Sequence, residues 1–144
     1  MGRNGVPHSI VLKTIEALES EVNNILSTIV PFRTVITVDD DSYKSIDINI
    51  VYFNDTESSY WNIDMGSGME KFITGLAFRI ALMNMGSAPR PAFMMIDEGF
   101  GVLSDQNMSQ IPNLFEALRY YFQYVLVVSH IDTIKSMTDQ IIEI

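Results

Sequence analysis

Cysteine is absent from this sequence of 144 residues, and its absence excludes several kinds of chemistry. Without thiols the chain forms no disulfide, holds no metal through sulfur and offers no cysteine nucleophile. The composition fits a reducing compartment, so we expect an intracellular protein of the cytoplasm or the nucleus. A leader pattern is also lacking, and no apolar run approaches the roughly 20 residues that cross a bilayer. We therefore expect a soluble chain without a membrane partner.

Positive charge is scarce as well. The chain has 9 Lys and Arg against 18 Asp and Glu, which gives a formal net charge of −9. Such a surface repels a phosphate backbone, and the basic residues are scattered rather than clustered. Binding of nucleic acid by this chain alone is therefore not expected. The acidic run at 39–41 could in principle hold a metal, although Asp is also common in solvated turns.

The first part of the sequence changes from a helical to a β pattern. Apolar residues recur at helical spacing over 9–29, between Pro7 and Pro31, with Ser9 as a candidate N-cap. Apolar and polar residues then alternate over 44–53, as in a half-buried strand. An antiparallel meander is completed by flanking strands at 33–38 and 60–63 and by turns at 39–42 and 54–58.

The second half predicts helices alternating with parallel strands. A helix that starts at Ser67 and ends at Gly86 is apolar nearly all round, which is typical of a buried helix. The unbroken apolar run 92–96 suits a strand in the middle of a parallel sheet. The remaining predicted elements are a helix at 112–123, a buried strand at 124–128, a short helix at 131–137 and a last strand at 140–144. The fold class is thus α/β, in one domain.

Ser67-Gly68-Met69-Glu70 opens the buried helix and permits two interpretations. Ser and Glu three residues apart form a capping box, in which each side chain accepts from a backbone N–H of the first turn. Free N–H groups, a glycine and a hydroxyl at a helix N-terminus also suit an anionic phosphate.

Two apolar strands end in polar residues that could take part in catalysis. Asp97 and Glu98 follow one strand, at the edge where α/β sheets bind ligands. One acid could bind Mg²⁺ while the other orients or deprotonates a water. His130 ends the second strand and could donate to a phosphate oxygen. The alternatives are a solvated loop for the acids and a local capping or packing role for the histidine.

Taken in order, these motifs resemble the second half of an ABC ATPase. Ser67-Gly68-Met69-Glu70 resembles the ABC signature, usually L-S-G-G-E or L-S-G-G-Q; residues 93–98 resemble Walker B with its catalytic Glu; and His130 resembles the switch histidine. Residues 98–103 are similar to the stretch before the D-loop of SbcC-like DNA-repair ATPases, rather than to the E-P-T-x-x-L-D of transporters. The segment 3–29 is similar to the helix that follows the coiled coil in that family.

The sequence departs from the pattern in three places. Gly66 and Met69 stand where the signature usually has Leu and its second Gly. In the D-loop region Leu103 is followed by Ser104 where Asp is expected, and Asp105 comes one place late. There is also no G-x-x-x-x-G-K-S/T, the Walker A loop that cradles phosphates. In the resembling family that loop belongs to an N-terminal lobe beyond a long coiled coil.

The resemblance therefore implies the C-terminal lobe of an SMC/SbcC-type ATPase head. Residues 1–30 would be the helix at the coiled-coil root, 31–64 the meander, and 65–144 the region of signature, Walker B and switch histidine. ATP with Mg²⁺ would be hydrolysed only with an N-terminal lobe carrying Walker A, from the same protein or a split chain. The isolated chain is expected to be inactive.

The resemblance also assigns roles to residues and implies partners. The signature residues 67–70 would bind nucleotide, Ser67 and Gly68 touching the γ-phosphate on an opposing head. Asp97 would hold Mg²⁺ through water, Glu98 would polarise the attacking water and His130 would sense the γ-phosphate. The partners would be a second head in an ATP-dependent dimer, an SbcD-like nuclease, and DNA bound by the assembled complex.

Three other functions remain open. A chromosome-architecture head would use ATP binding as a clamp more than as catalysis, and turnover and nuclease association would distinguish it. A transporter nucleotide-binding domain is disfavoured by Gly99-Phe100-Gly101. An interaction domain with decayed motifs would account for Met69 and Ser104.

Overall fold

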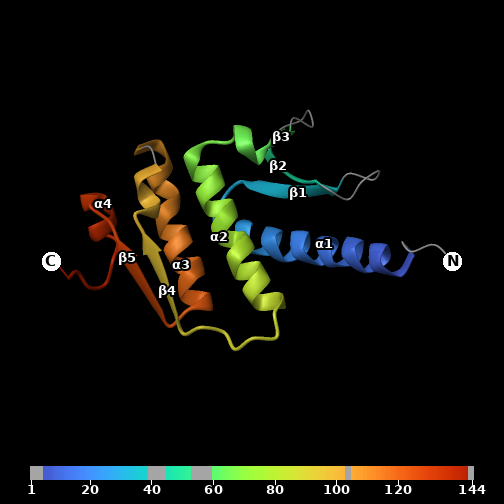
Figure 1. Cartoon of the computed structure of the whole chain (residues 1–144). Helices are drawn as coiled ribbons and strands as arrows, with labels where there is room; N and C mark the ends of the chain where they lie inside the picture. Colours follow the sequence, from blue (N-terminus) through green and yellow to red (C-terminus); the bar gives the residue numbers. More distant parts are fainter. Residues whose placement is uncertain (1–4, 39–44, 53–59, 103–104, 143–144) are drawn as a thin grey trace. The chain divides into compact units, whose positions relative to one another are not determined.

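In a computed structural model of the chain, residues 5–38, 45–52, 60–102 and 105–142 are described (Figure 1). They belong to two compact units, Met1–Ala88 and Pro89–Ile144. The expected single domain with its boundaries at 30 and 64 stays a prediction. Among the described helices, none has both the length and the apolarity that a membrane crossing requires.

The first unit combines two long helices with a small antiparallel sheet (Figure 1). Both α2 and β1 pack against α1. The core between the helices is formed by buried residues of α1, such as Val22, Ile25 and Leu26, and of α2, such as Ile73 and Ile80. The elements are α1 (Gly5–Leu26), β1 (Phe32–Val38), β2 (Ile46–Tyr52), β3 (Tyr60–Asn62), the 3₁₀ turn η1 (Ile63–Met65) and α2 (Gly68–Met85).

Helix α1 begins at Gly5, so the N-cap predicted at Ser9 is wrong. Ser9 lies inside the helix, and Pro7 occupies its first turn. A proline is tolerated there because the N–H groups of the first turn have no intrahelical acceptor in any case. The predicted helix is otherwise confirmed up to Leu26, after which a turn leads toward Pro31.

The meander is confirmed, with strand order β1-β2-β3 and antiparallel pairing throughout. Its two predicted turns lie outside the described residues. The expected alternation in β2 holds only in part, because Ile46 is 59% exposed whereas Asn49 is buried. Burial of Asn49 is possible because its amide donates to Thr37 Oγ1 at 3.3 Å.

Two side chains of α1 form hydrogen bonds with backbone groups at the outer edge of β1. Asn23 Oδ1 accepts from the N–H of Thr34 at 2.7 Å, and Asn23 Nδ2 donates to the Thr34 carbonyl at 2.8 Å. One helical turn earlier, Glu19 Oε2 accepts from the N–H of Ile36 at 2.6 Å. Helix α1 therefore takes the place of a fourth strand beside β1.

The second unit contains a two-stranded parallel sheet with α3 packed against β5 (Figure 1). Phe93 pairs with Tyr124 and Asp97 with Val128 at the two ends of the ladder. The core contains Leu114 and Leu118 of α3, which are fully buried. The elements are β4 (Phe93–Asp97), η2 (Gly99–Val102), η3 (Asp105–Gln110), α3 (Ile111–Tyr121), β5 (Tyr124–Val128) and α4 (Asp132–Lys135).

Two expectations for the second unit are wrong. The strands were expected to be buried on both sides, yet alternate residues are exposed: Phe93 (61%), Met95 (57%), Tyr124 (71%), Leu126 (48%) and Val128 (45%). Within the described residues the sheet has only two strands, so it lacks the neighbours that bury a central strand. The last strand is also absent at 140–142, where no strand backbone pairs with the chain and Ile142 is 80% exposed.

Candidate functional site

The start of α2 has the capping box that the sequence predicts. Ser67 is the N-cap, its Oγ accepts from the N–H of Glu70 at 3.3 Å, and Glu70 Oε2 accepts from the N–H of Ser67 at 2.6 Å. Ser67 and Gly68 are exposed, whereas Met69 is only 3% exposed. Met69, which stands where the signature that the sequence resembles has its second glycine, therefore packs in the core, while Ser67 and Gly68 remain exposed.

Gly66, which stands where the signature that the sequence resembles usually has leucine, lies in a tight turn. A Cβ atom at this position would lie 3.0 Å from the carbonyl oxygen of Ile63 and 3.3 Å from Glu70 Oε2. The Gly66 N–H itself donates to the Ile63 carbonyl at 2.9 Å and closes the 3₁₀ turn η1. The tight approach of η1 to the capping box therefore disfavours the usual leucine.

Tyr52 is a member of this site that sequence reasoning missed. Its hydroxyl donates to Glu70 Oε1 at 2.7 Å, so the carboxylate has a donor on each oxygen. Burial raises the pKa of Tyr52 above its ordinary value, and the hydrogen bond to Glu70 and the charge of Glu70 raise it further. The signal in the sequence was a tyrosine at the end of the alternating apolar set of β2, since a partly buried hydroxyl usually has a hydrogen-bond partner.

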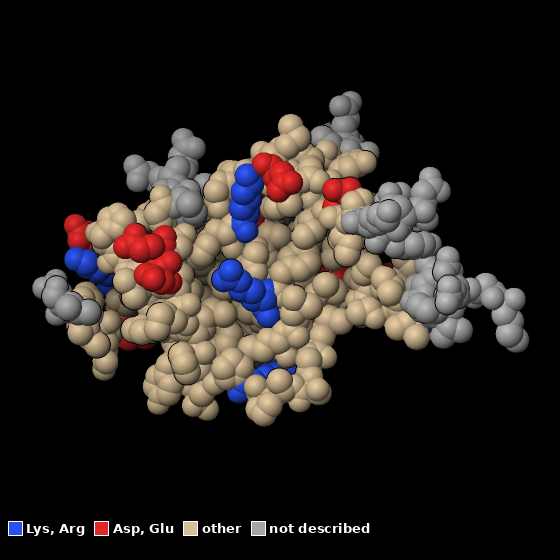
Figure 2. Space-filling model, viewed as in Figure 1, with Lys and Arg blue, Asp and Glu red and all other residues tan. Residues whose placement is uncertain are grey.

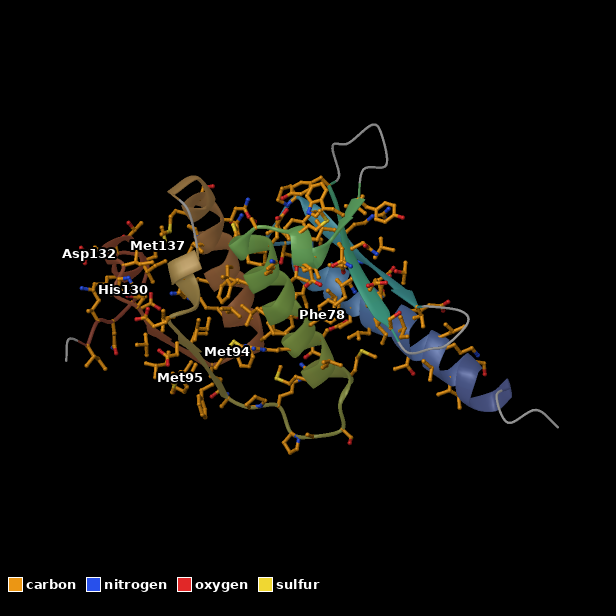
Figure 3. All side chains as sticks on the ribbon, turned by 45° about the horizontal axis from the view of Figure 1, so that its top comes forward. Phe78, Met94, Met95, His130, Asp132 and Met137 are labelled. Carbon is orange, nitrogen blue, oxygen red and sulfur yellow. The ribbon has the colours of Figure 1, made fainter. Side chains whose placement is uncertain are left out.

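The end of β4 places the predicted catalytic carboxylate beside the predicted switch histidine. His130 Nδ1 lies 3.1 Å from Glu98 Oε2 and 3.3 Å from Oε1, and both side chains are exposed. His130 follows the last residue of β5 by two positions and is labelled in Figure 3. The N–H of Glu98 donates to the Val128 carbonyl at 2.9 Å, which extends the ladder by one bond beyond Asp97.

Glu98 also has an unusual backbone. Its φ is 52°, and no other residue with a side chain in the described ranges has a positive φ. This left-handed conformation is sterically unfavourable for a residue with a Cβ, and such residues are concentrated at functional sites. The conformation accompanies the turn from β4 into η2, where the Glu98 carbonyl accepts from the N–H of Gly101 at 3.3 Å.

The residues present suit Mg²⁺ only as part of a larger set of ligands. Asp97 is exposed at the sheet edge next to Glu98, and no three acidic, His or Cys side chains in the described part of the chain form a metal cluster. Mg²⁺ commonly binds one or two carboxylates and completes its shell with water and substrate phosphates. Asp97 could therefore hold Mg²⁺ through water when a nucleotide supplies the remaining oxygens.

The predicted site residues form two clusters. Ser67, Gly68, Met69 and Glu70 lie together in the first unit, and Asp97, Glu98 and His130 lie together in the second. The structure does not place these two clusters relative to one another. Leu103 and Ser104 lie outside the described residues, and Asp105 begins η3 without a described side chain.

The charged side chains give no sign of a nucleic-acid surface on the face that Figure 2 shows. Lys and Arg lie there at separate positions instead of forming one cluster, and acidic side chains lie among them. Two of the described basic residues are already paired with acids, Arg119 with Asp139 and Lys135 with Asp132.

Comparison by sequence finds two relevant curated relatives, and no family model matches the chain. An uncharacterized protein of Acanthamoeba polyphaga mimivirus is 33% identical over 157 residues, which cover 100% of this chain and 11% of that protein. The SbcC component of the nuclease SbcCD of Clostridium acetobutylicum is 36% identical over 73 residues, 48% of this chain and 6% of that component. The chain thus spans only a small part of the curated relatives it matches.

Comparison by structure covers nearly the whole chain. An SMC ATPase studied for ATP-driven dimerization and DNA-stimulated activation matches 94% of this chain and 80% of its own, with TM-score 0.71 and 20% identity. The SMC head domain of Thermotoga maritima matches 91% and 44%, with TM-score 0.60 and 18% identity. The Pyrococcus furiosus Smc head, bound to the C-terminal domain of ScpA, matches 91% and 32%, with TM-score 0.59 and 21% identity. The chain has the fold of an SMC ATPase head, as the resemblance implied.

Proposed function

We propose that this chain is the C-terminal half of an SMC/SbcC-type ATPase head and contributes to ATP hydrolysis when another segment supplies Walker A. The observation that carries the proposal is the contact between Glu98 and His130 at the carboxyl edge of the parallel sheet. A carboxylate and an imidazole that meet at this edge can act together on a water and a phosphate. The SMC head fold supports placing a nucleotide there.

Each residue has a distinct task in the proposed reaction. ATP with Mg²⁺, when bound, supplies the phosphoryl group and part of the charge neutralisation that its transfer needs. Asp97 would hold the metal through water, and Glu98 would orient the attacking water and accept its proton. His130 directs Nδ1 toward Glu98, and its Nε2 can donate to a γ-phosphate oxygen when both ring nitrogens carry a proton. Ser67 and Gly68 contact the γ-phosphate on an opposing head.

In this proposal, hydrolysis depends on pairing of two heads. The start of α2 offers an exposed hydroxyl at a helix N-terminus, which attracts an anionic phosphate. No Walker A loop is present in the chain, so tight nucleotide binding requires the N-terminal lobe. ATP would therefore join two composite heads, and hydrolysis would release them.

We further propose that the assembled protein processes or tethers broken DNA ends with an SbcD-like nuclease. The partial similarity to the SbcC component of the nuclease SbcCD supports this assignment. The alternative is a chromosome-architecture clamp, which is favoured by the match to Smc heads bound to ScpA. Co-purification of the full-length protein with a nuclease would support the first function, whereas co-purification with a ScpA-like protein and slow turnover would support the second.

Calorimetry with Mg-ATP tests the half-head assignment. The chain alone is expected to bind weakly and to hydrolyse nothing, whereas its complex with a segment that carries Walker A should bind ATP and turn it over. Tight 1:1 binding by the chain alone would contradict the assignment. In the complex, Ser67→Arg should block ATP-dependent pairing without unfolding the chain.

A further inference from the structure

The Glu70 carboxylate is held from two directions inside the first unit. The Tyr52 hydroxyl of β2 donates to Oε1 at 2.7 Å, and the Ser67 N–H donates to Oε2 at 2.6 Å. Glu70 is only 8% exposed. A charged oxygen with so little access to water is costly to leave without a donor. Glu70 therefore depends on the meander for one donor and on the start of α2 for the other.

Tyr52 is itself fixed by the meander rather than by α2. Its ring stacks on Trp61 of β3, with centroids 5.5 Å apart and planes at 28°. On the other side Phe32 of β1 lies with its ring centroid also 5.5 Å away, at 53°. Aromatic residues from all three strands thus set the place of the hydroxyl. Because burial and Glu70 raise the pKa of Tyr52, the hydroxyl keeps its proton at the pH of any ordinary assay.

We infer that Tyr52 is a positioning residue for Ser67, acting through the buried carboxylate of Glu70. The inference rests on the proposed function, in which the Ser67 hydroxyl contacts the γ-phosphate on an opposing head. A capping box alone leaves its glutamate free to turn toward water. The Tyr52 hydrogen bond removes that freedom, so the Ser67 backbone is already ordered before a nucleotide arrives.

Removal of the Tyr52 hydroxyl should leave the Ser67 backbone less ordered before a nucleotide arrives. In Tyr52→Phe the ring and its stacking partners remain, but Glu70 Oε1 loses its donor. The carboxylate then turns toward water, and the Ser67 N–H loses its acceptor. Adding Glu70→Gln to this variant should lessen the damage, because the amide oxygen still accepts from the Ser67 N–H and a neutral amide costs less than a carboxylate to leave without its second partner.

Amide hydrogen exchange of the chain gives the first test, and this test is independent of any ATPase activity. Tyr52→Phe should raise the exchange rate at Ser67 by about tenfold, the loss expected for one hydrogen bond to a charged group. The matched control is Tyr60→Phe, because Tyr60 lies on β3 and is 64% exposed. An unchanged Ser67 exchange rate in Tyr52→Phe would overturn the inference.

ATP-dependent pairing gives the second test. The chain is assembled with the segment that carries Walker A, and the dissociation constant of paired heads is measured with a non-hydrolysable ATP analogue. Tyr52→Phe should weaken pairing by about tenfold, with the nucleotide affinity of the unpaired head unchanged. The double variant Tyr52→Phe with Glu70→Gln should regain most of the pairing, which a merely structural role would not produce.

The outcomes separate the inference from the proposed function. If Ser67→Arg abolishes pairing while Tyr52→Phe leaves it intact, the inference is wrong and the proposed function stands. A double variant that pairs as weakly as Tyr52→Phe would also overturn the inference. If Ser67→Arg pairs normally, the proposed role of Ser67 fails, and the inference fails with it.

Discussion

Glu98 combines a strained backbone with the proposed catalytic role, so substitution by glycine should relieve strain, whereas any substitution that removes its basicity should abolish activity. Its φ of 52° is a conformation in which a Cβ costs roughly 1–2 kcal/mol, a cost that glycine does not incur. The same residue is the proposed general base beside His130. Three variants, Glu98→Gly, Glu98→Ala and Glu98→Gln, distinguish the backbone effect from the chemical effect.

The backbone effect is the difference in free energy of unfolding between Glu98→Gly and Glu98→Ala. Both variants lose the carboxylate and its exposed contact with His130, so that loss cancels in the difference. Glycine removes the roughly 1–2 kcal/mol of steric cost, and the greater freedom of its unfolded chain offsets about 0.4–1 kcal/mol of this gain. Glu98→Gly should therefore have a free energy of unfolding about 0.5–1 kcal/mol larger than that of Glu98→Ala.

The chemical effect is measured as the ATPase rate of Glu98→Gln in the assembled head. The amide keeps the size and hydrogen-bonding capacity of the side chain but not its basicity, and loss of a general base typically costs on the order of 10²–10⁴ in rate. In the assembled head, ATP binding should persist, steady-state hydrolysis should collapse and paired heads should accumulate on size exclusion. The matched control is Glu116→Gln, an exposed glutamate of α3 that should keep full activity.

Two results would refute this reasoning separately. Denaturant unfolding that finds Glu98→Gly no more stable than Glu98→Ala would mean that the positive φ stores no strain. Near-normal turnover by Glu98→Gln would mean that Glu98 is not the base and that the similarity to Walker B does not carry the mechanism.

The remaining predictions concern nucleotide contacts and packing. Asp97→Asn should weaken Mg²⁺-dependent ATP binding itself, measured by calorimetry with and without the metal, whereas a pure loss of turnover would contradict a metal role. Ser67→Asp still caps α2 but places a negative charge toward the γ-phosphate, so ATPase activity should fall at unchanged melting temperature; an intact ATPase would favour capping alone. Gly66→Leu, although it restores the usual signature residue, should destabilise the chain by about 1–3 kcal/mol because of the close Ile63 carbonyl. Ile25→Ala should cost about 2–5 kcal/mol of unfolding free energy from the core of the first unit; a cost below about 1 kcal/mol would contradict its packing.

Local patterns in the sequence predicted most of the fold. Helix α2 was bounded by Ser67 and Gly86, and both residues cap it as expected. Strand β5 was predicted residue for residue. The error at Ser9 arose because proline signals a helix boundary without showing on which side of the proline the helix begins. The error at 140–142 arose because a short apolar tail forms a strand only where another strand pairs with it.

The candidate site was predictable only where its contacts are local or follow from strand ends. The three-residue spacing of Ser67 and Glu70 predicts their reciprocal hydrogen bonds, and parallel pairing of β4 and β5 brings Glu98 near His130. The bond from Tyr52 to Glu70 depends on how the meander packs on α2, which no periodicity reveals. Whether Ser67 meets a phosphate stays a prediction.

The side chains that α1 places along β1 bear on how this chain avoids aggregation. An unpaired strand edge is a template on which another chain can add a strand. Asn23 and Glu19 occupy the outward N–H groups of Thr34 and Ile36, so an incoming strand would first have to displace them. A truncated chain that lacks α1, or one in which α1 detaches during synthesis, would expose this edge. Such chains should self-associate through β1 and form β-rich aggregates, whereas the intact chain should not add strands at this edge.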